Sequence, residues 1–299
     1  MLKDFLDLET YNLIIKNFNF KDINEIRMRA NQKLIIVVKN KKYFLYKNNE
    51  EVIVSATQIE NFIKRACENS MYAYNQHICE GYITLNGGIR VGICGEIVSE
   101  NDKIKTIKNF QAINIRIPHI IKNCSLPALE FVADHDIKNT LILSAPGCGK
   151  TTFLRDLIYQ LSQNNCNKNL LIADERNEIC SMENGQACLD MGCFCDIYTN
   201  CSKKFAFNKG IRSMKPDVII TDEIDLENDL SIILEAINSG VNVIATIHAK
   251  DINQLKNKNG FASILERKFF SRFVVLTNDE GPGTLTKIYD ERLNVIFCR

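Results

Sequence analysis

The sequence predicts an α/β protein in which a mainly parallel sheet, within residues 121–299, follows a smaller α+β domain over residues 1–120. Three observations support this prediction. In the second half, nearly continuous apolar runs alternate with helical patterns, as expected when helices cover both faces of a parallel sheet. One of these runs leads through a glycine-containing loop, 144–149, directly into a helical pattern. The first half instead shows short alternating strands and an Asn-Gly-Gly turn at 86–88, which is typical of an antiparallel hairpin.

The composition is that of a globular protein, with 45% hydrophobic and 24% charged residues and a net charge of +1. This near-neutral charge gives no bulk attraction to nucleic acid, so we do not expect nucleic acid as a partner. No apolar run approaches the roughly 18 residues of a membrane-spanning helix, and the acidic start of the chain is unlike a signal peptide. We therefore expect a cytoplasmic protein that does not insert into a membrane itself, which leaves peripheral docking on a membrane complex open.

Twelve cysteines raise the question of a disulfide framework or a zinc site. The densest group is Cys188, Cys193, Cys195 and Cys201, with Cys180 upstream. Its spacings lack the paired C-x₂-C arrangement of a zinc site, and free cysteines often behave as small buried hydrophobes. We expect free cysteines and no metal in this group.

Elements of the first domain follow from periodicity and turn signals. Thr57, with Glu60 three residues later, resembles a capping box and predicts a helix start. Glu25, Arg27 and Arg29 share one strand face by period two, which we interpret as a solvated surface. The expected elements are helices within 1–18, from 57 onward and at 71–79, and strands at 23–29, 33–39, 43–46, 82–97 (a hairpin) and 112–117.

Elements of the second domain alternate between apolar strands and amphipathic helices. The last three strands are short and are expected to extend the same sheet. The expected elements are helices at 126–135, 153–161 and 226–238 and strands at 141–143, 169–173, 218–222, 241–246, 273–276, 284–289 and 295–297.

The strand–loop–helix stretch at 141–161 has the form of a phosphate-binding loop. Two glycines let backbone N–H groups turn toward anionic oxygens, the helix start adds the positive end of its dipole, and the lysine reaches the β- and γ-phosphates. Ser144 stands where the usual pattern begins with glycine. An ordinary glycine-rich turn is the alternative, which the intact Gly-Lys-Thr-Thr run disfavours. The expected nucleotide-binding residues are Ser144, Ala145, Pro146, Gly147, Cys148, Gly149, Lys150, Thr151 and Thr152.

The apolar strand 218–222 ends in two acids at its carboxyl end, where ligands bind in open α/β sheets. Asp222 is expected to hold Mg²⁺ together with the Thr151 hydroxyl, and Glu223 to polarise an attacking water. Capping of the next helix is an alternative that suits Asp225 better than these two acids.

Polar groups also end two further strands, as Asp174-Glu175-Arg176 and as Thr246-Ile247-His248. Parallel strands place all these groups at one edge of the sheet. A lone histidine beside a strand is usually structural, but this position favours a histidine that senses the γ-phosphate.

The order of these motifs resembles the type II/type IV secretion ATPase superfamily, whose members are RecA-like motors with a Walker A loop, an Asp box, a Walker B strand and a His box. The resemblance rests on the phosphate loop, the acidic box, the Arg-Ser-Met-x-Pro-Asp-Val-Ile-Ile-x-Asp-Glu-Ile run and Ala-Thr-Ile-His-Ala. More narrowly, the chain is similar to the stage III sporulation protein AA family in three stretches: 25–29, 81–92 and 174–179.

The resemblance assigns roles residue by residue. Lys150 and Thr151 fall on Walker A, and Asp222 falls on Walker B. In the superfamily, arginines of the N-terminal domain approach the nucleotide phosphates, and two arginines match by position. The catalytic residues so implied are Glu223 of Walker B, Glu175 of the Asp box, His248 of the His box, Arg90 and Arg116.

The resemblance implies a Mg²⁺-dependent ATPase with ATP and Mg²⁺ as its cofactors. It further implies a homo-oligomeric ring, expected to be a hexamer, that energises a channel between mother cell and forespore through integral membrane partners. Ser144 and the Cys-Phe-Cys-Asp run at 193–196, where the family tends to show Arg-Thr-Asp, motivate an alternative: an ATP-binding assembly scaffold with little turnover. A nucleic-acid motor is disfavoured by the near-neutral charge, and a small-molecule kinase by the lack of a recognisable acceptor lid.

Overall fold

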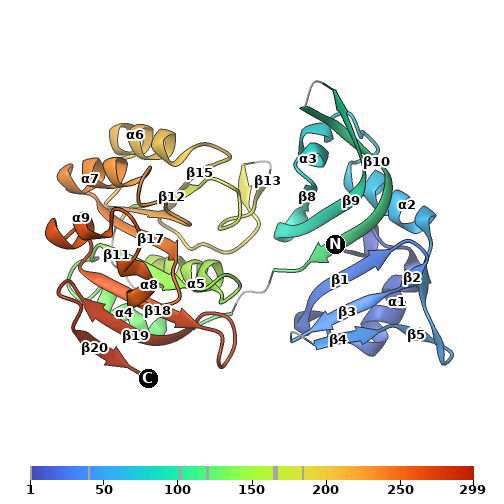
Figure 1. Cartoon of the computed structure of the whole chain (residues 1–299), viewed down its shortest axis with the longest axis horizontal. Helices are drawn as coiled ribbons and strands as arrows, with labels where there is room; N and C mark the ends of the chain where they lie inside the picture. The colour runs from blue at the N-terminus through green and yellow to red at the C-terminus, as the bar shows by residue number, and fades with distance from the viewer. Residues whose placement is uncertain (1, 40, 101–102, 119–120, 164–167, 184) are drawn as a thin grey trace. The chain divides into compact units, whose positions relative to one another are not determined.

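A computed structural model describes residues 2–299 with the exception of 40, 101–102, 119–120, 164–167 and 184. It divides into two compact units, residues 1–119 and 120–299, each with its own sheet and apolar core (Figure 1).

The first unit is built on a six-stranded antiparallel sheet in the order β4-β3-β1-β10-β9-β8. Alternate residues of its central strands are buried, as in Ile26 and Met28 of β1, and pack in one core with residues of helices α1 and α2. The main elements are α1 (Leu8–Asn17), β1 (Ile23–Arg29), β2 (Gln32–Lys33), β3 (Ile35–Val38), β4 (Lys41–Phe44), β5 (Tyr46–Lys47), β6 (Glu50–Glu51), β7 (Ile53–Val54), α2 (Ala56–Ala66), α3 (Asn75–Cys79), β8 (Tyr82–Leu85), β9 (Ile89–Glu100) and β10 (Lys103–Arg116).

The hairpin predicted at 82–97 is confirmed, since β8 and β9 pair across a turn in which Gly87 and Gly88 both have positive φ. The capping box predicted at Thr57 is wrong. The capping residue is Ser55, two residues before Thr57, and α2 begins at Ala56; Ser55 and Gln58 exchange the capping hydrogen bonds at 3.1 and 2.8 Å. The helix predicted at 71–79 is also too long, because only 75–79 is α-helical.

The second unit contains an eight-stranded sheet in the order β15-β12-β16-β17-β11-β18-β19-β20. The first six strands of this order are parallel, and the last two are antiparallel. The elements are α4 (Leu126–Val132), β11 (Thr140–Ser144), α5 (Lys150–Gln163), β12 (Leu170–Asp174), β13 (Met182–Glu183), β14 (Gln186–Ala187), β15 (Cys195–Thr199), α6 (Lys203–Ser213), β16 (Val218–Thr221), α7 (Leu230–Asn238), β17 (Asn242–His248), α8 (Ile252–Lys256), α9 (Phe261–Glu266), β18 (Arg272–Thr277), β19 (Thr284–Asp290) and β20 (Val295–Cys298).

Both faces of this sheet are covered. On β11, Leu141 and Leu143 pack in a core with residues of α6, α7, α8 and α9, while Ile142 packs in a second core with residues of α4 and α5. This two-sided burial explains why the strands are continuously apolar, and it confirms the predicted parallel sheet. Two helix starts differ from the prediction, because α5 begins at Lys150 and α7 at Leu230.

Parallel pairing in this register aligns the carboxyl ends of four strands, β12, β16, β17 and β11. Ser144 at the end of β11 pairs with His248 at the end of β17, and β16 lies between β17 and β12. The polar groups that follow these strands therefore meet at one edge of the sheet.

Candidate nucleotide site

The loop at 145–149 joins the end of β11 to the first turn of α5. Gly147 and Gly149 have φ of 75° and 85°, a conformation that glycine adopts without strain. Ser144, at the position where the motif usually has glycine, ends β11 with a negative φ, and its hydroxyl donates to the carbonyl of Ala145 at 2.9 Å. Because no left-handed conformation is needed at this position, serine fits there. Thr151 and Thr152 lie in the first turn of α5 and are half-buried.

Lys150 is buried and donates to His248 across the sheet edge. Its Nζ lies 2.7 Å from Nδ1 of His248 and 3.4 Å from the carbonyl oxygen of Ser144. Burial lowers the pKa of Lys150, while Glu223 and Asp222 act in the opposite direction. An ammonium group only donates, so Nδ1 of His248 accepts this bond, and the ring proton of the neutral imidazole resides on Nε2.

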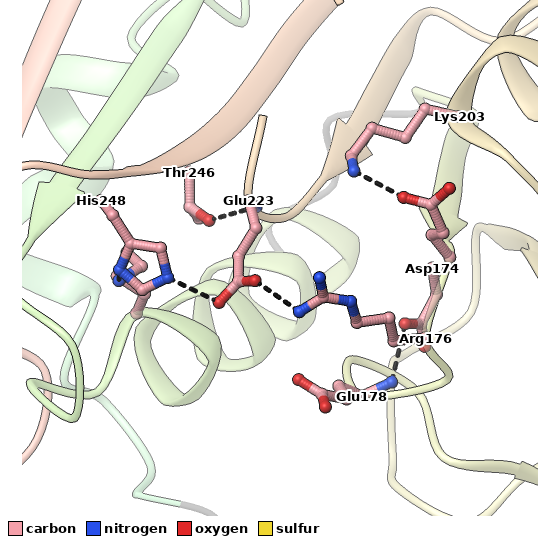
Figure 2. A network of polar contacts seen from close by, with 9 residues as sticks. Asp174, Arg176, Glu178, Lys203, Glu223, Thr246 and His248 are labelled. Carbon is pink, nitrogen blue, oxygen red and sulfur yellow. Dashed lines mark hydrogen bonds and ion pairs between the residues drawn. The ribbon is translucent and has the colours of Figure 1, made fainter. Parts of the chain in front are cut away.

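The other ring nitrogen of His248 contacts Glu223. Its Nε2 lies 2.8 Å from Oε1 of Glu223, and the guanidinium of Arg176 lies 2.8 Å from Oε2 of the same carboxylate. Figure 2 shows the three side chains in a row, with Glu223 between His248 and Arg176. Both oxygens of Glu223 are therefore engaged in this state.

The backbone of Glu223 is fixed in an uncommon conformation. Its φ is +44°, its N–H donates to the hydroxyl of Thr246 at 2.9 Å, and the next N–H, of Ile224, donates to the carbonyl of Thr246 at 2.8 Å. Left-handed backbone at a non-glycine residue carries strain and is concentrated at functional sites. Burial raises the pKa of Glu223, but His248, Arg176 and Lys150 together outweigh burial, so the pKa lies below its ordinary value.

Asp222 is only 4% exposed and lies among other acids. Burial raises its pKa to about 7, with further increases from Asp174, Glu178 and Glu223 and an opposing effect of Lys203. A carboxylate held in an excess of negative charge is a site that a divalent cation would stabilise.

Asp174 and Glu175 have different surroundings. The Asp174 carboxylate accepts the backbone N–H groups of residues 178, 179 and 180 and so shapes the loop that follows β12; part of this contact appears in Figure 2. Arg155 of α5 holds the same loop by donating to the carbonyls of Glu178 and Ile179. Glu175 forms an ion pair of 2.8 Å with Lys203.

Arg90 and Arg116 belong to the first unit. They are cross-strand partners on β9 and β10, and the Arg90 guanidinium lies 3.9 Å from the centroid of the Tyr82 ring. Their expected approach to a nucleotide stays a prediction.

Contributors to this site that were not among the predicted site residues include Arg176, Thr246 and Lys203. Arg176 and Thr246 stand inside motifs that the sequence singled out, so their position was the available signal. Lys203 begins α6, and nothing in the surrounding sequence distinguishes it.

The residues present fit a nucleotide with Mg²⁺. The loop offers two left-handed glycines, a helix start and a buried lysine to phosphates. Asp222 and Thr151, as hard oxygen donors, suit Mg²⁺. Among the described residues, no group of three or more His, Cys, Asp or Glu side chains forms an all-protein metal cage.

The sequence is similar to one protein family and to two proteins described below. The family described as "Sporulation stage III, protein AA" matches residues 6–296. "Stage III sporulation protein AA" of Bacillus subtilis (strain 168) is 33% identical over 280 residues, which cover 92% of this chain and 89% of that protein. "Uncharacterized protein ycf45" of Cyanidium caldarium is 29% identical over 131 residues, or 40% of this chain and 36% of that protein.

Solved structures with a similar fold are secretion and pilus ATPases. The ATPase DotB of Yersinia pseudotuberculosis has a TM-score of 0.62 at 17% identity, over 97% of this chain and 81% of that chain. The ATPase DotB of Legionella pneumophila has a TM-score of 0.61 at 15% identity, over 91% of this chain and 76% of that chain. The pilus retraction motor PilT with bound ADP has a TM-score of 0.58 at 14% identity, over 90% of this chain and 77% of that chain. These likenesses confirm the predicted RecA-like fold of secretion ATPases.

Proposed function

This chain belongs to the sporulation stage III, protein AA family, and from that premise we propose that it is a Mg²⁺-dependent ATPase of the secretion type. The observation that carries the proposal is the connection from Lys150 through His248 to Glu223. A phosphate-binding lysine and an acid suited to activating water are thereby joined by one imidazole.

We assign the binding roles to the phosphate loop. The amides of the loop and of the α5 start, with Lys150, bind the β- and γ-phosphates. Thr151 and Asp222 hold Mg²⁺, which supplies charge neutralisation on the phosphate oxygens. The excess negative charge around Asp222 supports this assignment, since a cation there relieves repulsion between carboxylates.

Glu223 is proposed to orient and deprotonate the attacking water. Its low pKa keeps it ionised at neutral pH, and Thr246 fixes its backbone. When Lys150 turns to a phosphate, Nδ1 of His248 loses its donor and is left free to accept a hydrogen bond from water, because an unprotonated Nδ1 cannot donate to a phosphate oxygen. Because His248 contacts both Lys150 and Glu223, the hydrogen bonding around Glu223 would depend on whether a nucleotide is bound. Glu175, paired with Lys203, supports the same edge of the site.

We further propose that the protein acts as a homo-oligomeric ring, of six subunits. Charge that develops on a transferred phosphoryl group is commonly stabilised by an arginine from elsewhere, in cis or in trans. Arg90 and Arg116 are the proposed donors. Among the described residues no helix is long and apolar enough to cross a bilayer. From the family resemblance we also propose that the protein lies in the cytoplasm of the mother cell, docked on integral membrane proteins of a channel to the forespore, whose assembly or transport it energises.

A second candidate is an ATP-binding scaffold with little turnover. The observation that favours it is the engagement of both Glu223 oxygens, by His248 and by Arg176. In that state each carboxylate oxygen already accepts one hydrogen bond, so a water competes for the single lone pair that remains on each oxygen, and release of Arg176 would favour hydrolysis.

Phosphate release by the full-length chain with Mg²⁺ and ATP separates the two candidates. The ATPase predicts measurable turnover that is lost in both Lys150→Ala and Glu223→Gln, with nucleotide binding lost only in the first. The scaffold predicts nucleotide binding by wild type with phosphate release no faster than by Glu223→Gln. Solution mass with and without a nonhydrolysable ATP analogue tests the ring, and a nucleotide-independent monomer at micromolar concentration contradicts it.

A further inference from the structure

The turn between β18 and β19 contacts the phosphate loop through backbone atoms. The N–H of Gly283 donates to the carbonyl of Cys148 at 2.8 Å. A Cβ at Gly149 would lie 2.3 Å from the Gly283 nitrogen and 2.6 Å from the carbonyl carbon of Pro282. Gly149 thus needs to be glycine both for its φ of 85° and for this close approach of two backbones.

The hydrogen bond from Gly283 fixes a specific peptide group. The carbonyl of Cys148 and the N–H of Gly149 belong to one planar trans peptide, so they point in opposite directions. Holding the carbonyl against the turn directs the Gly149 N–H away from the turn. The carbonyl of Gly149 is held separately, because it accepts the N–H of Phe153 at 2.9 Å in the first turn of α5.

The turn that supplies this hydrogen bond is itself anchored in the sheet. Thr277 and Thr284 are cross-strand partners at its base, and the Thr277 hydroxyl donates to the Asp279 carboxylate at 2.8 Å. β18 is also the parallel neighbour of β11, the strand that leads into the phosphate loop. The turn and the phosphate loop therefore extend from adjacent strands of one sheet. This arrangement fixes the Cys148–Gly149 peptide before any ligand binds.

We propose that Gly283 is a positioning residue of the phosphate site: its amide holds the Cys148–Gly149 peptide so that the Gly149 N–H is preset to donate to a phosphate oxygen of a nucleoside di- or triphosphate. The proposal rests on the function proposed above. A preset donor strengthens binding because no reorganisation is needed when the anion arrives. The alternative is that the turn packs on the loop only for stability.

The test displaces Gly283 without changing the loop sequence. At Gly283 a Cβ would lie 3.4 Å from the Gly149 carbonyl oxygen and 3.5 Å from the Phe153 Cβ, at φ of 82°. Gly283→Val places a branched side chain against these atoms in a conformation that valine avoids, and Gly283→Ala is the milder version. Gly281→Val is the matched control, because Gly281 also has positive φ, of 124°, but has no atom within 4 Å of its Cβ position.

Calorimetric titrations of the full chain would use Mg²⁺ with a nonhydrolysable ATP analogue, ADP or tripolyphosphate, each at a temperature where every variant is folded. We expect Gly283→Val to bind all three about tenfold to a hundredfold more weakly than wild type, as for loss of one hydrogen bond to a charged group. Gly281→Val should keep wild-type affinity, and Gly283→Ala should fall between.

Two results overturn this inference and are distinct from failure of the proposed function. If Gly283→Val binds tripolyphosphate as tightly as wild type while melting at a lower temperature, the turn serves stability only. If Gly281→Val loses affinity as much as Gly283→Val, general strain in the turn explains both. If wild type itself binds none of the three ligands, it is the proposed function that fails.

Discussion

Replacing Asp222 by asparagine is expected to stabilise the ligand-free chain, and increasingly so as the pH rises. Burial and the neighbouring Asp174 and Glu178 raise the pKa of Asp222 from 3.8 to about 7. In the folded state this carboxyl therefore holds its proton more tightly than in the unfolded chain. Stability is highest at pH values below the unfolded pKa and is lost as the pH rises toward the folded pKa.

The magnitude follows from the shift. A change from 3.8 to about 7 corresponds to about 4 kcal/mol of stability lost once the pH exceeds both values, at 1.36 kcal/mol per pK unit. Part of that loss is already present at pH 5. The gap in unfolding free energy between Asp222→Asn and wild type should accordingly widen by roughly 2 to 3 kcal/mol between pH 5 and pH 8.5.

Urea denaturation across this pH range, with a chelator and without nucleotide, measures the gap. Asp225→Asn serves as the control, because Asp225 is exposed and hydrogen bonds from residues 227 and 228 hold its pKa below 3.8, so its replacement should leave a gap that does not change between pH 5 and pH 8.5. A gap for Asp222→Asn that is constant with pH would refute the reasoning, since it would mean that the buried carboxyl titrates alike in the folded and unfolded chains.

Three further changes give expected outcomes at other points of the chain. Arg176→Ala frees one oxygen of Glu223, so steady-state phosphate release should be at least as fast as in wild type; a large decrease would instead make Arg176 a required ligand. Arg155→Leu leaves the carbonyls of residues 178 and 179 without their donor, and urea denaturation should show a loss of about 2 to 4 kcal/mol; an unchanged midpoint would contradict it. Ser55→Ala removes the capping box of α2 and should cost about 1 kcal/mol in the same assay, whereas Thr57→Ala should cost less.

The parallel sheet was predictable because its strands are buried on both faces and therefore read as continuous apolar runs. β15 escaped prediction for the opposite reason. All five residues of β15 are half-buried at an edge of the sheet, and their sequence, Cys-Asp-Ile-Tyr-Thr, has no apolar run. Likewise β10 begins at Lys103, nine residues before the predicted strand, because its first half is largely exposed and rich in lysine.

The candidate site was predictable as a set of residues but not as a set of contacts. Lys150, Glu223 and His248 each follow or end a strand, and parallel strands bring such positions to one edge. That His248 lies between the other two depends on strand order, since β17 separates β16 from β11. Strand order is set by packing of whole elements, and no local pattern encodes it. The contact of Gly283 with the phosphate loop depends on a turn more than 130 residues away along the chain.

A single-turnover experiment tests the central claim most directly. Full-length chain in excess over radiolabelled ATP, with Mg²⁺, is quenched over time, and bound ATP and ADP are separated. Wild type is predicted to convert its bound ATP to ADP, Glu223→Gln to hold ATP unconverted, and Lys150→Ala to bind none. Conversion by Glu223→Gln at the wild-type rate would contradict the assignment of Glu223 as the group that activates water.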